Sequence, residues 1–158
     1  MTPATSSEVA AADLTLVWID AESAVIVTWR NHAATFERFV SDVPAHQHAM
    51  PHIRHDPLIR HGGGESQNAA AMRRRDRLTR FCGRVRERLP EAGAVMVIGP
   101  GSIHEDFARE VVEDDRRHRR ARSVDSASSP PLTDRQLVAM VRRLAGDEPR
   151  RRRIGSGI

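Results

Sequence analysis

The chain has 158 residues, which is enough for one complete hydrophobic core and short for two domains. All 25 of its basic side chains are arginine and 21 side chains are acidic, so the formal net charge is only +4 although the sequence pI is about 10.9. The single cysteine, Cys82, excludes an internal disulfide, and no apolar run is long enough to span a bilayer. These features predict a cytoplasmic globular protein that has no membrane partner.

The charges are segregated along the sequence. Residues 1–50 carry 2 basic and 6 acidic groups, and residues 94–115 carry 1 and 6. Residues 51–93 carry 10 basic and 5 acidic groups, and residues 116–158 carry 12 and 4. Because arginine keeps its charge and binds phosphate through paired N–H groups, the basic stretches suit nucleic acid better than the net charge suggests.

The N-terminal part predicts a β-hairpin. The runs Leu14–Asp20 and Ala24–Trp29 are rich in β-branched and aromatic residues and are separated only by Ala21-Glu22-Ser23, so they pair antiparallel. A weaker third strand is predicted over Thr35–Val40, where a helix is the open alternative.

Periodicity is lost between Ser41 and Asn68. This stretch holds three prolines and the triplet Gly62-Gly63-Gly64, so it predicts a long mobile loop that is functional or disordered. No cysteine accompanies its histidines and no helix fixes their spacing, which favours adventitious metal binding; no metal site and no cofactor is predicted. These histidines are His46, His48, His52, His55 and His61.

A long amphipathic helix is predicted over Ala69–Leu89, ending at Pro90. Its apolar face consists of Leu78, Phe81, Cys82, Val85 and Leu89. A stripe on the opposite face consists of Arg73, Arg77, Arg80, Arg84 and Arg88. A solvated face and an RNA-binding face are equal alternatives for this stripe. On the second hypothesis, the RNA-binding residues are Arg73, Arg74, Arg75, Arg77, Arg80 and Arg84.

A buried strand, a tight turn and a helix follow one another after residue 93. The run Ala94–Ile98 is typical of a strand buried on both faces, and Gly99-Pro100-Gly101 is a turn. Ser102 and Glu105 then predict a capping box at the start of a helix. An anion site there is the less favoured alternative, because acidic residues already occupy the first turn.

The C-terminal part predicts a strand near residues 121–125 and an amphipathic helix that covers the sheet. Thr133 and Gln136 form the capping box of this helix. We therefore predict one α/β domain over residues 13–145, a mixed sheet with an N-terminal antiparallel hairpin flanked by helices. Residues 1–12 and 146–158 are predicted to be flexible tails.

Several short motifs give residues 13–145 a resemblance to a known family. The motifs are the hairpin segment Val17-Trp18-Ile19-Asp20, the turn Gly99-Pro100-Gly101 with Asp106-Phe107, and the segment Leu132–Val138. They resemble the middle domain of archaeo-eukaryotic peptide-chain release factors and of the ribosome-rescue protein Pelota, and short bacterial translational machinery proteins. The resemblance implies a ribonuclease-H-like sheet flanked by helices and a role on the ribosome, with rRNA or tRNA as the partner.

The resemblance also implies where a catalytic loop would lie. In release factors a Gly-Gly-Gln loop ahead of an arginine-rich helix promotes hydrolysis of peptidyl-tRNA. The matching positions here are Gly63, Gly64 and Glu65, so a carboxylate replaces the amide, and Gln67 follows two residues later. Another departure is His104, where Pelota-like relatives carry lysine.

These departures favour a noncatalytic ribosome- or RNA-associated translation factor of the rescue, stress or hibernation type. The alternative is a peptidyl-tRNA hydrolase with a degenerate loop. A nuclease is disfavoured, because Asp20 is the only acid in the first strand and no clustered carboxylates for two metal ions are evident.

Overall fold

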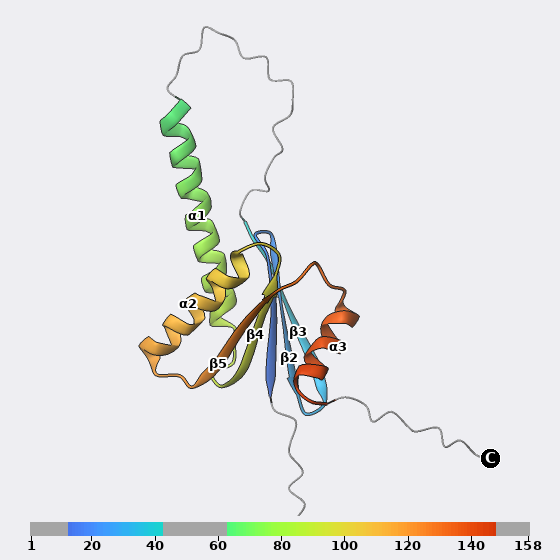
Figure 1. The fold of residues 1–158 in the computed structure, drawn as a ribbon. Helices are drawn as coiled ribbons and strands as arrows, with labels where there is room; N and C mark the ends of the chain where they lie inside the picture. The colour runs from blue at the N-terminus through green and yellow to red at the C-terminus, as the bar shows by residue number, and fades with distance from the viewer. Residues whose placement is uncertain (1–12, 43–62, 148–158) are drawn as a thin grey trace, which may run out of the picture.

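In the computed structural model, which describes residues 13–42 and 63–147, five strands form one mixed sheet in the order β3-β2-β1-β4-β5 (Figure 1). The strands β3, β2 and β1 are antiparallel neighbours, whereas β1, β4 and β5 run parallel. The predicted fold class, a mixed sheet with an N-terminal hairpin, is confirmed. The strand bounds are β1 (Leu14–Ile19), β2 (Ser23–Arg30), β3 (Ala33–Val40), β4 (Gly93–Gly99) and β5 (Arg122–Ser128).

In the described part of the chain, three helices flank the sheet on its two faces. They are α1 (Gly63–Glu87), α2 (Ile103–His118) and α3 (Asp134–Leu144). The helices α1 and α2 cover one face and α3 covers the other (Figure 1). Within residues 13–42 and 63–147, no helix combines the length and the apolar character that a membrane span requires.

The central strand β1 supplies both hydrophobic cores, because successive side chains of a strand point to opposite faces. Val17 and Ile19 pack with the side chains of α1 and α2, whereas Leu16 and Trp18 pack on the α3 side. All six residues of β1 are buried, including the polar residue Thr15. The sheet is therefore organised around β1, with the predicted buried strand β4 beside it.

Helix α3 is attached to the sheet by both tryptophans. The indole N–H of Trp18 donates to the carbonyl of Pro130 at 3.1 Å, and that of Trp29 donates to the carboxylate of Asp147 at 3.1 Å. The guanidinium of Arg142 lies 5.5 Å from the centroid of the Trp29 ring. The segment that follows α3 is thus held against β2 as far as Asp147.

The helix α1 begins six residues earlier than predicted, at Gly63 instead of Ala69. The sequence from Glu65 to Ala71 contains no proline and no β-branched residue, so nothing stops the helix from extending. It escaped prediction because this part carries no apolar periodicity, and its described side chains from Gln67 to Ala71 are exposed. The interpretation of Gly63, Gly64 and Glu65 as a loop is therefore wrong, since they form the first turn of α1.

The structure confirms some of the other predictions about secondary structure and capping and contradicts others. Thr35–Val40 is a strand, so its helical alternative is wrong. The capping box of Thr133 is confirmed, with both reciprocal hydrogen bonds present. The capping box predicted at Ser102 is wrong, because its side chain caps nothing and its backbone is helical (φ −104°, ψ −8°) instead of extended. The five loop histidines lie outside the described residues.

The turn after β4 explains part of the Gly-Pro-Gly motif. A Cβ atom on Gly99 would lie 2.1 Å from the carbonyl oxygen of Ile19, which leaves no room for a side chain. We expect Gly99→Ala to lower the free energy of unfolding by about 1–3 kcal/mol, because β4 must shift away from β1. Urea denaturation followed by tryptophan fluorescence measures the loss.

Gly83 in α1 is the matched control for that substitution. Apart from the neighbouring helix backbone, no described atom lies within 4 Å of a Cβ atom placed there, so Gly83→Ala is expected to stabilise the helix by about 0.5–1 kcal/mol. Changes of the same sign at both positions would contradict the prediction.

Candidate nucleic-acid interface

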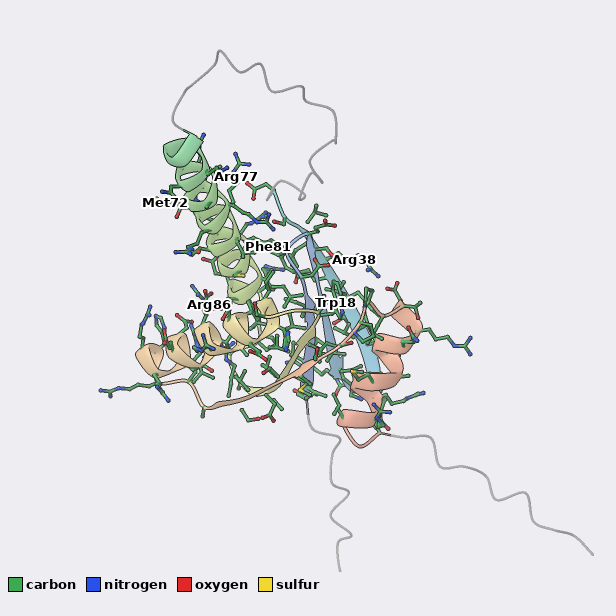
Figure 2. All side chains as sticks on the ribbon, turned by 45° about the horizontal axis from the view of Figure 1, so that its top comes forward. Trp18, Arg38, Met72, Arg77, Phe81 and Arg86 are labelled. Atoms are coloured by element: carbon green, nitrogen blue, oxygen red, sulfur yellow. The ribbon has the colours of Figure 1, made fainter. Side chains whose placement is uncertain are left out.

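The N-terminal half of α1 projects beyond the sheet (Figure 1). In its C-terminal half, Phe81 and Val85 are fully buried in the core. From Gln67 to Arg77, in contrast, every side chain is exposed except the half-buried Arg74. Met72 is 66% exposed on this part of the helix, where Figure 2 shows it together with Arg77. This half of α1 is therefore accessible to a partner from several sides.

The predicted arginine stripe lies along α1 with its charges available. Arg73 donates to a carbonyl of its own helix, and Arg77 and Arg84 donate to the carbonyls of Asp42 and Val40 at 3.4 Å. A backbone carbonyl does not neutralise a guanidinium. Within the described part of the chain, no ion pair is formed by Arg73, Arg74, Arg75, Arg77, Arg80 or Arg84.

Arg74 and Arg75 point away from the centre of the stripe. At 100° per residue they are turned by about 100° and 200° from Arg73. Arg73, Arg74 and Arg77 surround a hollow of about 270 Å³ together with Ala70, whereas Arg75 lines a groove that faces α2. Four of the six predicted residues, Arg73, Arg77, Arg80 and Arg84, therefore share one face of α1. Arg74 lies beside this face, and Arg75 lies on the opposite side of the helix.

Arg86 in the last turn of α1 and Arg88 just after its end have structural partners. The Nε of Arg88 lies 2.6 Å from the carboxylate of Glu37 on β3, so the stripe of free charges ends at Arg84. Arg86 lies 3.8 Å from the carboxylates of Glu110 and Asp114 on α2. Arg88, a member of the stripe but not one of the predicted RNA-binding residues, is therefore paired within the fold.

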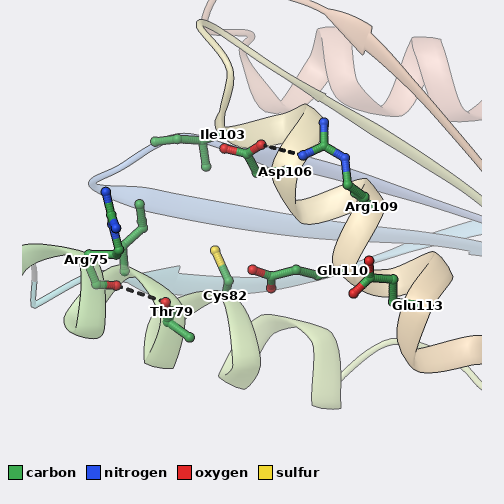
Figure 3. Close-up of a pocket in the computed structure, with 9 residues that line it drawn as sticks. Arg75, Thr79, Cys82, Ile103, Asp106, Arg109, Glu110 and Glu113 are labelled. Atoms are coloured by element: carbon green, nitrogen blue, oxygen red, sulfur yellow. Dashed lines mark hydrogen bonds and ion pairs between the residues drawn. The ribbon is translucent and has the colours of Figure 1, made fainter. Parts of the chain in front are cut away.

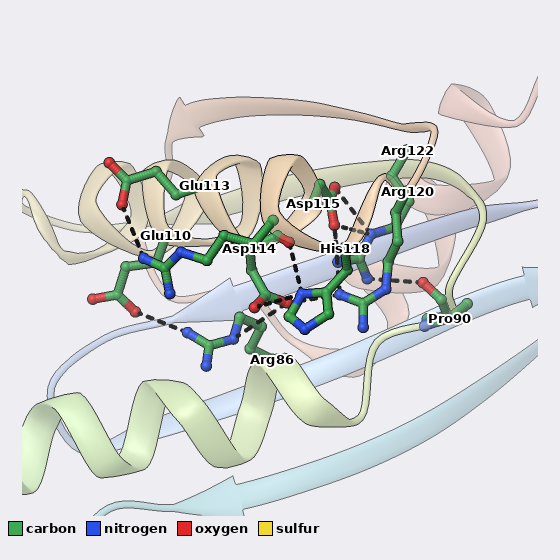
Figure 4. A network of polar contacts seen from close by, with 10 residues as sticks. Arg86, Pro90, Glu110, Glu113, Asp114, Asp115, His118, Arg120 and Arg122 are labelled. Carbon is green, nitrogen blue, oxygen red and sulfur yellow. Dashed lines mark hydrogen bonds and ion pairs between the residues drawn. The ribbon is translucent and has the colours of Figure 1, made fainter.

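The basic run after α2 is also partly internal (Figure 4). Arg120 donates to the carboxylate of Asp114 at 2.6 Å, and this hydrogen bond lowers the pKa of Asp114. Arg122 is only 2% exposed and donates to both carboxylate oxygens of Asp115 and, at 2.9 Å, to the carbonyl of Pro90. These arginines connect α2, β5 and the segment before β4, so they belong to the fold.

The remaining candidate residues divide between the tip of α1 and the body of the domain. Gly63, Gly64 and Glu65 lie in the first turn of α1, followed by the exposed Gln67, at the end of the helix farthest from the sheet (Figure 1). Asp20 accepts backbone N–H groups of the β1–β2 turn at 2.8 Å, which is a structural role.

His104 does not reach the surface. It is 2% exposed at the start of α2, and its Nδ1 atom is buried with no hydrogen-bond partner among the described residues. Among the described residues, no group of three or more His, Cys, Asp or Glu side chains is placed to hold a metal ion.

No family model and no curated protein matches the sequence. Among solved structures, the chain is similar to the crystal structure of Archaeoglobus fulgidus Pelota, with 16% sequence identity and a TM-score of 0.36. The match covers 86% of this chain and 34% of the Pelota chain, so the chain spans about a third of that protein. This likeness assigns neither a family nor an activity to the chain.

Sequence reasoning missed the groove between α1 and α2. One signal was present in the sequence: Asp106, Glu110 and Glu113 recur at i, i+4 and i+7, which places three carboxylates along one face of a helix. Only the packing of α2 beside α1 shows that this face lines a groove.

Proposed function

We propose that the chain is a ribosome- or RNA-associated translation factor that binds RNA phosphates through α1 and catalyses no reaction. The observation that carries the proposal is the set of arginines on α1 from Arg73, on its projecting half, to Arg84, which form no ion pair with described residues and are exposed or half-buried. The resemblance of residues 13–145 to release-factor middle domains supports translation as the setting.

Arginine on an exposed helix is suited to this partner. Its planar guanidinium donates two parallel hydrogen bonds to a phosphate and remains charged at any physiological pH. The stripe from Arg73 to Arg84 covers three turns of α1 and contains Asp76 as its only acidic neighbour in that interval. A charge of this sign and extent attracts the backbone of rRNA or tRNA.

The absence of catalysis in this proposal rests on Glu65. A carboxylate at that position is repelled by RNA phosphates and lacks the N–H group that an amide offers to a developing oxyanion. The alternative, a peptidyl-tRNA hydrolase, would have to use Gln67 or backbone N–H groups of the first turn of α1.

Pelleting with ribosomes over a salt series tests the proposal. If about six phosphates are neutralised, the affinity falls by roughly 10³-fold between about 50 and 200 mM salt. Peptidyl-tRNA on the same ribosomes is expected to remain intact. An affinity that does not change with salt would contradict the RNA contact, and release of peptide would establish the hydrolase instead.

A further inference from the structure

A groove of about 380 Å³ separates α1 from α2 (Figure 3). Its α1 lining includes Cys82, which at 100° per residue lies on the side of α1 opposite the arginine stripe. Leu78, Cys82 and Ile103 contribute its apolar part. Burial raises the pKa of the Cys82 thiol to about 12, with Glu110 adding to the rise, so the thiol is neutral and belongs to this apolar part. The volume lies at the lower end of the range of sites that hold small ligands.

The α2 wall of the groove is acidic and incompletely paired. Asp106 accepts a hydrogen bond from Arg109 at 3.2 Å. Glu110 and Glu113 accept none from the part of the chain that the structure describes, and their nearest cations, on Arg86 and Arg117, lie 3.8 Å away. Two carboxylates therefore have acceptor capacity that the fold leaves unused.

Arg86, 3.8 Å away, compensates the charge of Glu110 only in part. Burial raises the pKa of its carboxyl above the ordinary value, and the neighbouring Asp106 and Glu113 raise it further, whereas Arg86 acts in the opposite direction. Arg75 also lines the groove, on the α1 side, and has no ion pair with a described residue. Arg75 does not reach Glu110. A cation in addition to Arg86 could therefore donate hydrogen bonds to the Glu110 carboxylate.

We propose that this groove binds a basic segment of a partner protein, anchored by an arginine side chain whose guanidinium contacts Glu110. The aliphatic stem of arginine matches the apolar part of the groove, and its N–H groups supply the missing donors. The acidic wall repels phosphate, so RNA on the opposite face of α1 does not compete for the site. The proposal does not depend on the proposed function.

The spacing of the carboxylates suits an extended segment. Glu110 lies four positions after Asp106, which is about 6 Å along the axis of α2. Alternate residues of an extended chain are about 6.6 Å apart. Two arginines separated by one residue therefore match the two carboxylates, and the second arginine competes with Arg109 for Asp106.

The test is a titration of the isotope-labelled full chain with the peptide acetyl-Gly-Arg-Gly-Arg-Gly-amide, followed by amide chemical shifts. Saturable shifts are expected at Thr79, Cys82 and Glu110. The same peptide with citrulline in place of both arginines is expected to cause none. Glu110→Gln is expected to weaken binding of the arginine peptide about tenfold, as loss of a charge-assisted hydrogen bond implies.

Controls separate this site from the RNA interface and from the fold. Glu22→Gln makes the same charge change on an exposed side chain of the β1–β2 turn and is expected to leave peptide binding unchanged. Glu110→Gln is expected to fold, because it removes a carboxylate whose ionisation burial disfavours. It is also expected to pellet with ribosomes as the wild type does.

Three results would overturn the proposal. Equal shifts with the citrulline peptide would mean that the guanidinium charge is not recognised. Displacement of the arginine peptide by millimolar Mg²⁺, with shifts at the same amides, would identify a cation site. Self-association that Glu110→Gln abolishes, seen by sedimentation equilibrium, would make a second copy of the chain the occupant.

Discussion

Asp115→Ala is expected to lower the free energy of unfolding by about 3–5 kcal/mol, because it leaves the buried guanidinium of Arg122 without its counterion. The side chain of Arg122 is 2% exposed, and its other hydrogen bond among the described residues is to the carbonyl of Pro90, which supplies no charge. The pair joins α2 to β5, so its loss weakens the sheet at that edge. Urea denaturation followed by tryptophan fluorescence measures the effect.

The control for this prediction is Asp125→Ala. Asp125 lies on the same strand as Arg122 but is exposed, so its loss is expected to change stability by no more than about 0.5 kcal/mol. The double variant Asp115→Leu with Arg122→Met replaces the pair by apolar side chains and is expected to recover most of the loss. A loss below about 1 kcal/mol for Asp115→Ala would show that water reaches the guanidinium.

The neighbouring pair of Arg120 and Asp114 makes the stability of the fold depend on pH. The hydrogen bond from Arg120 lowers the pKa of Asp114 below its ordinary value of 3.8. The folded state therefore binds this proton less readily than the unfolded state does. The resulting stabilisation is present above pH 3.8 and is lost as the pH falls through the lowered pKa.

The sequence alone was sufficient to predict those helices and strands whose buried face produces a periodic pattern of apolar residues. The hairpin, β4 and the helix capped at Thr133 each combine apolar periodicity with a turn or cap signal, and each is present in the structure. The start of α1 was not predictable in this way. Residues such as Ala70 and Met72 pack against no described element, so this part of the sequence shows no apolar periodicity from which a helix could be predicted.

The candidate interface shows a second limit, which concerns the pairing of charges. Sequence position identifies Arg84 and Arg88 as members of one helix face, and their spacing is the same as that of other stripe residues. Only the placement of β3 beside α1 decides that Arg88 reaches Glu37 and that Arg84 meets a neutral carbonyl. Which arginines are free for a ligand is therefore a property of tertiary structure.

The triple variant Arg73→Ala, Arg77→Ala, Arg80→Ala is expected to weaken ribosome binding by several kcal/mol at low salt. Each arginine that neutralises a phosphate releases about one counterion on binding, so the slope of log affinity against log salt should fall by about three. All three side chains are exposed on α1, opposite Cys82 and the core. The free energy of unfolding should therefore stay near that of the wild type.

A charge-matched variant decides whether position or net charge is responsible. Arg116→Ala, Arg135→Ala and Arg143→Ala together remove the same three charges from exposed positions on α2 and α3. Because these residues lie away from the projecting half of α1, their removal should leave the salt slope nearly unchanged and weaken binding only through the long-range field, an effect that salt screens. Equal losses in the two variants would mean that RNA is held by the overall charge of the molecule and not by α1.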